Sequence, residues 1–484
     1  MFGSTQPEQK LTPRILACRK GSIVAPAGCG KTEEIANAGA YSHERRLILT
    51  HTLAGVDAIR RRLIEKGVKR DRHDVTTIAS WALRFASAFP QRSSLIATNP
   101  ADTDWPSVYA AATRLLKGAY INTVIKASYA GLLVDEYQDC TRSQHELIIA
   151  LATLLPCCIF GDRFQAIFDF RAEPVPDWEK EVLSTFPVIT YLKEPHRWIK
   201  EGNRAVGTWL LQCRKELWST GQIDLSRIPA NLPVYFLRLS TNKKEMHRER
   251  VQLVYKALAR THDGGKTIII ADRANERGRA LLASKVTAAN IEPVSCKRIA
   301  EFVDELPKVL REERLALVLD LVKDTMTGTR PSVLRQRIGI PDAKRRTQLR
   351  PAEQACLDVS TTSDIASVLR LLETICQEAR WIYRRELHSI VCHGLREFLS
   401  DRHKSLADAV WHVQNQRRYV GRSFGTRNMG STLLVKGLQF EHVIITDVHT
   451  MTKRDLYVAM TRGSRSITVI APSRILRPKQ SDND

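Results

Sequence analysis

A glycine-bearing turn near the N-terminus constrains this chain more than any other feature. The segment IVAPAGCGKT (23–32) places a short apolar stretch before the turn and a helical pattern after it. Glycines let the backbone N–H groups of such a turn face an anion, and the helix N-terminus adds the positive end of a dipole. Lys31 can reach the outer phosphates of a nucleotide, and Thr32 can place its hydroxyl on Mg²⁺. The pattern predicts a phosphate-binding P-loop, and the alternative is a surface turn without a ligand. The nucleotide-binding residues of the P-loop would be Gly28, Cys29, Gly30, Lys31 and Thr32.

Two adjacent acids follow the next strong strand pattern, in the run DEYQD (135–139). Ligands of open parallel sheets lie at the carboxyl ends of the strands, which is where this pair would be delivered. A P-loop enzyme needs an Asp there to hold Mg²⁺, and a neighbouring carboxylate can orient or deprotonate the attacking water. We therefore expect Asp135 to be the metal ligand and Glu136 the base, a capped helix start being the alternative.

A third stretch, GDRFQAIFDFR (161–171), again follows an apolar strand pattern. Gln and Arg beside aromatic rings suit phosphate sensing and base stacking, although Phe164 also fits a packed cluster of rings. Before the P-loop, the amide of Gln9 could read an adenine edge, or could simply be exposed.

Composition limits the partners and the number of domains. The chain has 484 residues, so two to four domains are expected at roughly 100–200 residues each. Its 74 Lys and Arg against 52 Asp and Glu give a formal net charge of +22, which favours a polyanionic partner such as nucleic acid. The 10 cysteines show no zinc-binding spacing, and no apolar run reaches the ~20 residues of a membrane helix. With no apolar signal core at the N-terminus, a cytoplasmic protein without membrane contact is expected.

Strand and helix patterns alternate over most of the chain, which is typical of an α/β fold with parallel sheets. Helical periodicity alone dominates the stretch from about 297 to 419. The expected organisation is a first domain with a short insertion, a second domain interrupted by a helical insertion, and a disordered tail. The first domain is expected at 1–195, with its short insertion at about 85–128. The second domain is expected at 196–298 and 426–474, with the helical insertion at 299–425 between its two parts. The tail is expected at 475–484.

Taken together, these stretches resemble the motif series of superfamily-one DNA helicases of the UvrD/Rep/PcrA type. DEYQD resembles that family's DExQD box and GDRFQAIFDFR its GDxxQxIYxFR motif, while VKGLQF (435–440) and YVAMTR (457–462) resemble KGLEF and YVALTR. The resemblance implies two RecA-like parallel-sheet P-loop motor domains that use ATP and Mg²⁺. It also implies catalytic roles for Lys31, Glu136, Gln165, Arg197 and Arg462, the last two as arginine fingers.

Further contacts follow from the same resemblance. Additional nucleotide-binding residues would be Gln9, His196, Arg273, Gly437 and Gln439. DNA-binding residues would be Thr52, Ser80, Trp81, Phe168, Phe170 and Arg171, Trp81 having core packing as its alternative. The resemblance implies a helicase or translocase that moves 3′ to 5′ on single-stranded or partly duplex DNA.

Several motifs depart from the family pattern. Leu433 stands for a histidine, Gln439 for a glutamate, and Pro195-His196 for Asn-Tyr, so that adenine stacking would fall to His196. The short first insertion and the compact size resemble, at a weaker level, the small UvrD-like subunits of bacterial anti-phage systems such as Gabija. An alternative is therefore a nucleotide-gated, DNA-sensing subunit that works with a nuclease and unwinds weakly. An RNA helicase is a third interpretation, because these residues do not show whether the protein reads the 2′-OH that distinguishes RNA from DNA.

Overall fold

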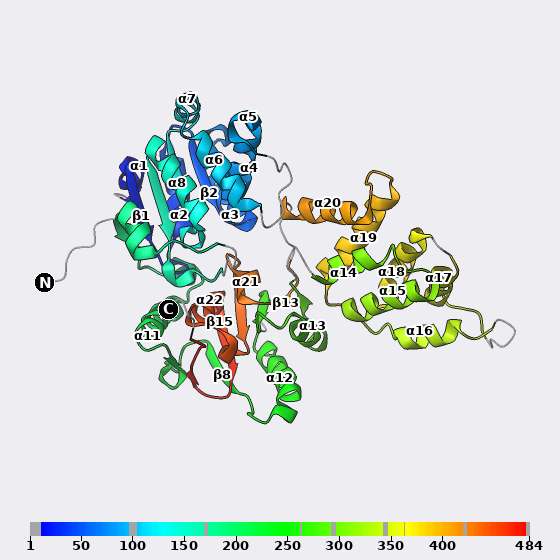
Figure 1. Ribbon diagram of the computed structural model, residues 1–484. Coiled ribbons are helices and arrows are strands. Elements are labelled where there is room, and N and C mark those ends of the chain that lie inside the picture. Colours follow the sequence, from blue (N-terminus) through cyan, green and yellow to red (C-terminus); the bar gives the residue numbers. More distant parts are fainter. Residues whose placement is uncertain are drawn as a thin grey trace.

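Two parallel sheets and a separate group of helices make up the structure, a computed structural model (Figure 1). It describes residues 11–480 apart from 96–103, 169–172, 262–263, 292–296, 342–346, 363 and 420–423. Gln9, Phe170 and Arg171 lie outside the described residues. The two sheets lie one above the other in Figure 1, and the helical group extends to one side.

The first sheet has six parallel strands, so every strand ends at the same edge. Their order is β3 (His73–Thr77), β2 (Arg46–Thr50), β4 (Gly131–Val134), β5 (Cys157–Gly161), β1 (Lys20–Val24) and β6 (Val188–Tyr191). The central strands are apolar along their whole length because helices cover both faces. Cys157 and Cys158, which point to opposite faces of β5, are both buried, as their apolar surroundings predict.

One face of this sheet packs against three helices: α1 (Leu11–Ala17), α2 (Lys31–Tyr41) and α3 (Leu53–Glu65). The other face carries the remaining helices: α4 (Ile78–Ala88), α5 (Pro90–Ser93), α6 (Trp105–Leu115), α7 (Ala119–Ser128), α8 (Arg142–Leu154) and α9 (Leu183–Thr185). Trp81 of α4 is 2% exposed and stacks on Phe85 with 4.7 Å between ring centroids. The ring of Trp81 thus lies in the core, the alternative given above, because α4 packs against α6; the DNA contact expected for Trp81 stays a prediction.

The second sheet is also six-stranded and parallel. Its order is β10 (Ala289–Asn290), β13 (Arg427–Gly430), β9 (Thr267–Ile270), β14 (Phe440–Ile445), β15 (Gly463–Ala471) and β8 (Val234–Arg238). Its helices are α10 (His196–Lys200), α11 (Arg204–Ser219), α12 (Lys243–Leu258), α13 (Glu276–Lys285), α21 (Thr432–Val435) and α22 (Lys453–Met460). The two sheets confirm the expected α/β class with two parallel-sheet domains.

The segment expected to be a disordered tail begins with ordered structure. Residues Ile475–Leu476 form β16, which pairs antiparallel with β7 (Ile223–Asp224). Leu476 is buried because its side chain joins the core beneath α11. The tail prediction is therefore wrong for these residues, since pairing with β7 and the burial of Leu476 hold the segment to the second domain.

Helices with their own core form the insertion in the second domain: α14 (Lys297–Glu305), α15 (Arg311–Thr325), α16 (Pro331–Ile338), α17 (Pro351–Thr361), α18 (Ile365–Glu378), α19 (Arg385–Leu399) and α20 (Leu406–Tyr419). In α18, Asp364 caps the N-terminus, and one apolar stripe is buried, formed by Val368, Leu371, Leu372 and Ile375. A short antiparallel pair, β11 (Met326–Thr327) with β12 (Trp381–Ile382), was not expected in this segment. Two residues per strand are too few to leave a period-2 pattern.

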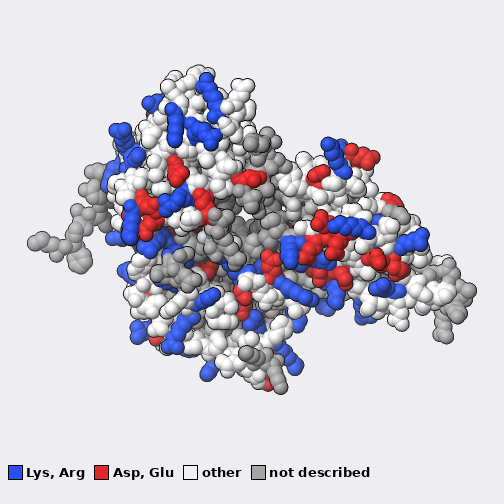
Figure 2. Space-filling model, viewed as in Figure 1, with Lys and Arg blue, Asp and Glu red and all other residues white. Residues whose placement is uncertain are grey.

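Charge is spread over the surface. On the face in Figure 2, Lys and Arg lie over both sheet domains and the helical insertion, with Asp and Glu interleaved among them. The excess of positive charge is thus not gathered into a single patch on this face. Within the described part of the chain, no helix combines the length and apolar character needed to span a bilayer.

Candidate nucleotide site between the two sheets

The P-loop connects β1 to α2 at the carboxyl edge of the first sheet. Gly28 and Gly30 adopt left-handed backbone conformations, with φ of 74° and 97°. Lys31 is 7% exposed, and its Nζ donates to the carbonyl oxygen of Ala25 at 3.0 Å. The ammonium group therefore points back into the loop. Cys29 is buried inside the loop, which raises the pKa of its thiol to about 11.

The paired acids lie at the end of β4, beside the P-loop. The Thr32 side chain forms a hydrogen bond with Asp135, whose carboxylate also accepts from the backbone N–H of Glu136 at 2.9 Å. Burial and the adjacent Glu136 raise the pKa of Asp135 to about 7. Burial alone would also raise the pKa of Glu136, but Lys31 and Lys436 lower it to about 2. The acid expected to act as a base is thus the one held ionised.

These residues fit a magnesium ion bound with a nucleotide. Mg²⁺ is usually held by one or two protein oxygens together with phosphates and water, and Thr32 and Asp135 supply such oxygens side by side. Among the described residues, no group of three or more His, Cys, Asp or Glu could form an all-protein metal site.

Gln165 lies after β5 with its amide directed at Asp162. Its Nε2 donates to Asp162 Oδ2 at 3.1 Å, and Gln165 is 4% exposed. The backbone N–H of Asp162 donates to the Gln138 side chain at 3.0 Å, and Gln138 in turn donates to Glu136 at 2.5 Å. The expected phosphate sensor and the expected base are thus joined by one hydrogen-bonded chain.

Arg197 and Arg462 enter the cleft from the second domain. Arg197 Nη1 donates to the carbonyl oxygen of Thr461 at 2.5 Å, and its backbone N–H donates to the Gly28 carbonyl of the P-loop at 3.1 Å. Arg462 donates from Nε to Val458 O at 2.9 Å. Burial lowers the pKa of Arg197 to about 10, and burial together with Arg197 lowers that of Arg462 to about 9.

Other residues expected at the nucleotide lie around the same cleft. His196 lies over Gly30, where an added Cβ would come 3.2 Å from its ring. Arg273 Nη1 donates across the cleft to Ile167 O at 3.1 Å, in the loop after β5. Gly437 (φ 79°) and Gln439 are exposed between α21 and β14.

Three expected DNA-binding residues are described besides Trp81. Thr52 caps α3 by accepting from the Gly55 N–H at 3.1 Å, and Ser80 accepts from the Thr77 hydroxyl at 2.8 Å. Phe168 is half-buried with Lys436 Nζ 4.7 Å from its ring centroid. The first two follow β2 and β3 at the same carboxyl edge as the P-loop, but β4 and β5 lie between these strands and β1.

Sequence reasoning assigns no role to the charged pairs that join the two domains. Lys436 contacts Asp139 at 2.5 Å, and Arg214 of α11 contacts Asp162 at 2.6 Å. Lys436 and Asp139 lie inside two of the recognised motifs, VKGLQF and DEYQD. Their opposite charges were the one feature of the sequence that could have suggested this pair. Arg214 lies in a helix with no motif, so nothing in the sequence connects it to Asp162.

The second sheet contains a similar local geometry without the P-loop. Glu136 has φ of 54° and begins a 3₁₀ turn after β4, and Asp447 has φ of 55° and begins one after β14. Asp447 forms an ion pair with Arg250 at 2.8 Å. This acid is therefore neutralised by an arginine of its own domain.

Comparison with known proteins supports the resemblance over part of the chain. Residues 91–176, which include the paired acids and Gln165, match the family model of the UvrD/REP helicase N-terminal domain. A similar solved structure is that of Arterivirus nonstructural protein 10 (helicase) with DNA: it is 10% identical, has a TM-score of 0.35, and aligns over 96% of this chain and 63% of that one. The chain thus spans less than two thirds of that helicase. No curated protein matches significantly.

Proposed function

We propose that this chain is an ATP-dependent helicase or translocase that moves 3′ to 5′ on single-stranded DNA. The observation that carries the proposal is the convergence of Lys31, the paired acids and two second-domain arginines on one cleft. The helicase domain match over 91–176 supports the same function. ATP and Mg²⁺ would be held by the P-loop, Thr32 and Asp135.

The geometry suits phosphoryl transfer to water. The reaction spreads negative charge over the γ-phosphoryl oxygens, so catalysis depends on positioning and on fixed positive charge. Mg²⁺ would neutralise phosphate oxygens, and Glu136, whose pKa is lowered by Lys31, would accept a proton from the attacking water. Arg197 and Arg462 would supply positive charge from the second domain.

Domain motion would couple the reaction to DNA. In the observed arrangement Arg462 Nη1 donates to Leu438 O at 3.0 Å, and Nη2 donates to the Thr461 hydroxyl at 3.0 Å. An arginine finger must exchange such bonds for phosphate oxygens when nucleotide binds. Closure of the cleft around ATP and its release after hydrolysis would provide two states that step along a strand.

The direct test is ATP hydrolysis by the purified chain with and without single-stranded DNA. We expect stimulation by DNA, loss of turnover in Lys31→Ala, and ATP binding without turnover in Glu136→Gln. Duplexes with 3′ or 5′ single-stranded tails would test the direction, and RNA competitors would test the choice of polymer. Unstimulated ATPase, or full activity in Lys31→Ala, would overturn the proposal.

A second candidate is a nucleotide-gated DNA sensor that works with a nuclease partner. The burial of Trp81 favours it, because one residue expected to contact DNA is committed to the core. ATP-dependent DNA binding without strand separation, together with copurification of a nuclease, would support this candidate. Efficient unwinding of tailed duplexes by the chain alone would exclude it.

A further inference from the structure

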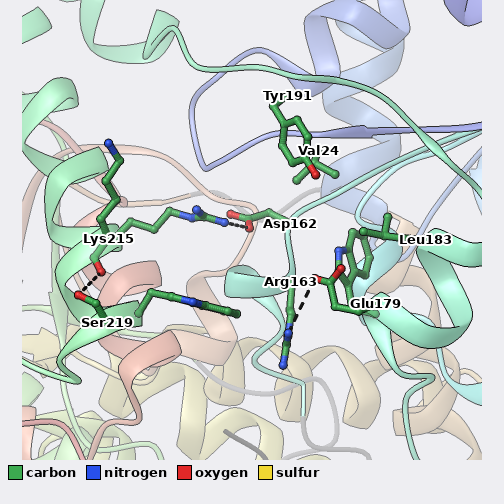
Figure 3. Close-up of a pocket in the computed structure, with 11 residues that line it drawn as sticks. Val24, Asp162, Arg163, Glu179, Leu183, Tyr191, Lys215 and Ser219 are labelled. Atoms are coloured by element: carbon green, nitrogen blue, oxygen red, sulfur yellow. Dashed lines mark hydrogen bonds and ion pairs between the residues drawn. The ribbon is translucent and has the colours of Figure 1, made fainter.

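An ion pair joins a helix of the second domain to the loop that follows β5. Arg214 Nη2 lies 2.6 Å from Asp162 Oδ1, and the side chains are 28% and 0% exposed (Figure 3). Arg214 belongs to α11, which packs against α22 in the core of the second domain. The pair therefore crosses the cleft.

Asp162 holds several parts of the candidate catalytic site. Its Oδ2 accepts from Gln165 Nε2 at 3.1 Å, and its Oδ1 accepts from the backbone N–H of Phe164 at 3.1 Å. Its own backbone N–H donates to Gln138, the residue that donates to Glu136. Movement of Asp162 would therefore displace both Gln165 and Gln138.

A fully buried carboxylate needs a cation in contact. Removing the partner of a buried charge is strongly unfavourable, since the charge left behind is neither solvated nor paired. Arg214 is the cation that contacts Asp162, and its guanidinium also lies over the Phe164 ring, 5.5 Å from the centroid. Its Nε is buried without a hydrogen-bond partner. Asp162 and the Phe164 ring thus fix the orientation of the Arg214 guanidinium group.

We infer that Arg214 is a positioning residue for ATP hydrolysis, acting through Asp162 on Gln165 and on the Gln138–Glu136 pair. The inference rests on the proposed function. Because Arg214 comes from the second domain, opening of the cleft separates it from Asp162 and releases Gln165. The site is thereby assembled only when the domains are closed.

A cavity lies beside the pair. It has a volume of about 460 Å³, and its walls include Asp162, Arg163, Tyr191 and Lys215 (Figure 3). Water in this cavity can solvate the guanidinium group as the domains part. The pair can therefore open and close with the catalytic cycle.

The test measures DNA-stimulated ATP turnover in Arg214→Gln, Arg214→Lys and Asp162→Asn. Lys215→Gln is the matched control, because Lys215 is the exposed neighbour on the same helix and lines the same cavity. We expect Arg214→Gln to lower kcat about 10- to 100-fold with little change in the KM for ATP, since a misplaced catalytic group costs rate rather than binding. Arg214→Lys should recover part of the loss.

Coupling to Gln165 separates positioning from a general structural role. In a Gln165→Ala background, Arg214→Gln should lower kcat by a clearly smaller factor than in the wild type, because one of the two groups that it positions is already absent. An equal loss in both backgrounds, or an effect no larger than that of Lys215→Gln, would overturn the inference. If Arg214→Gln does not fold, Arg214→Lys and Asp162→Asn in the same two backgrounds decide the question. Wild-type protein without DNA-stimulated ATPase would instead refute the proposed function.

Discussion

Lys436 of the second domain places its ammonium group 2.5 Å from both carboxylate oxygens of Asp139 in the first. The same Nζ donates to the carbonyl oxygen of Gln165 at 2.6 Å. The side chains of Lys436 and Asp139 are 7% and 1% exposed, so little water competes for the contact. One cation therefore fastens two first-domain motifs to the second domain.

Removal of this cation should impair closure of the cleft. Lys436→Met leaves Asp139 buried without its partner, and breaking such a pair costs about 3–5 kcal/mol. We expect lower kcat/KM for ATP, while Asp139→Asn with Lys436→Met should lose little more than either single variant. The measurement is a double-mutant cycle on DNA-stimulated ATPase, with Lys200→Met on the exposed side of α10 as control. Strictly additive losses would contradict a direct pair.

Binding of magnesium with nucleotide should release a proton. Burial and Glu136 raise the pKa of Asp135 to about 7, so the free protein is largely protonated there below that pH. Because the metal binds the ionised carboxylate, affinity for Mg²⁺·ADP should increase as pH rises from about 6 to 8 and then level off. Calorimetry in two buffers of different ionisation enthalpy counts the protons. Asp135→Asn should abolish the release of this proton. An unchanged proton count in that variant would show that the proton comes from another group.

Gly28 should not tolerate a side chain. An added Cβ would lie 2.5 Å from Cζ3 of Trp198, on a backbone with φ of 74°. Gly221 has φ of 72° but open space around it, so Gly221→Ala isolates the backbone strain of about 1–2 kcal/mol. We expect Gly28→Ala to weaken nucleotide binding more than about 10-fold, equivalent to at least 1.4 kcal/mol, while Gly221→Ala retains binding. Fluorescent nucleotide titration compares the two, and equal affinities would contradict the clash.

Trp81 should affect stability more than DNA binding. Truncation of a buried tryptophan typically costs about 3–5 kcal/mol, so Trp81→Ala should unfold at markedly lower denaturant concentration. Trp81→Phe keeps an aromatic ring against Phe85 and should bind single-stranded DNA like the wild type. Chemical denaturation and fluorescence anisotropy measure the two properties separately. Weaker DNA binding at unchanged stability in Trp81→Phe would restore the base-stacking role.

Local patterns were sufficient to predict the elements around the nucleotide site. Apolar runs before the P-loop turn, before Asp135 and before Asp162 predicted β1, β4 and β5, because a parallel strand buried on both faces leaves a continuous apolar signal. Helical periodicity from about 297 to 419 likewise predicted the helical insertion, in which α18 begins at the Asp364 cap and buries one apolar face. Such signals fail when burial comes from one residue, as for Leu476 in the expected tail.

The candidate catalytic residues were predicted from the sequence, and the contacts that connect them were decided by the tertiary structure. Lys31, Thr32, Asp135 and Glu136 are set by the backbone turns and strand ends that carry them, which are local properties. The pairing of Arg214 with Asp162 joins residues 52 positions apart, and that of Lys436 with Asp139 joins residues 297 apart. Which distant charges meet depends on how two separately folded sheets pack together, and no local pattern encodes that contact.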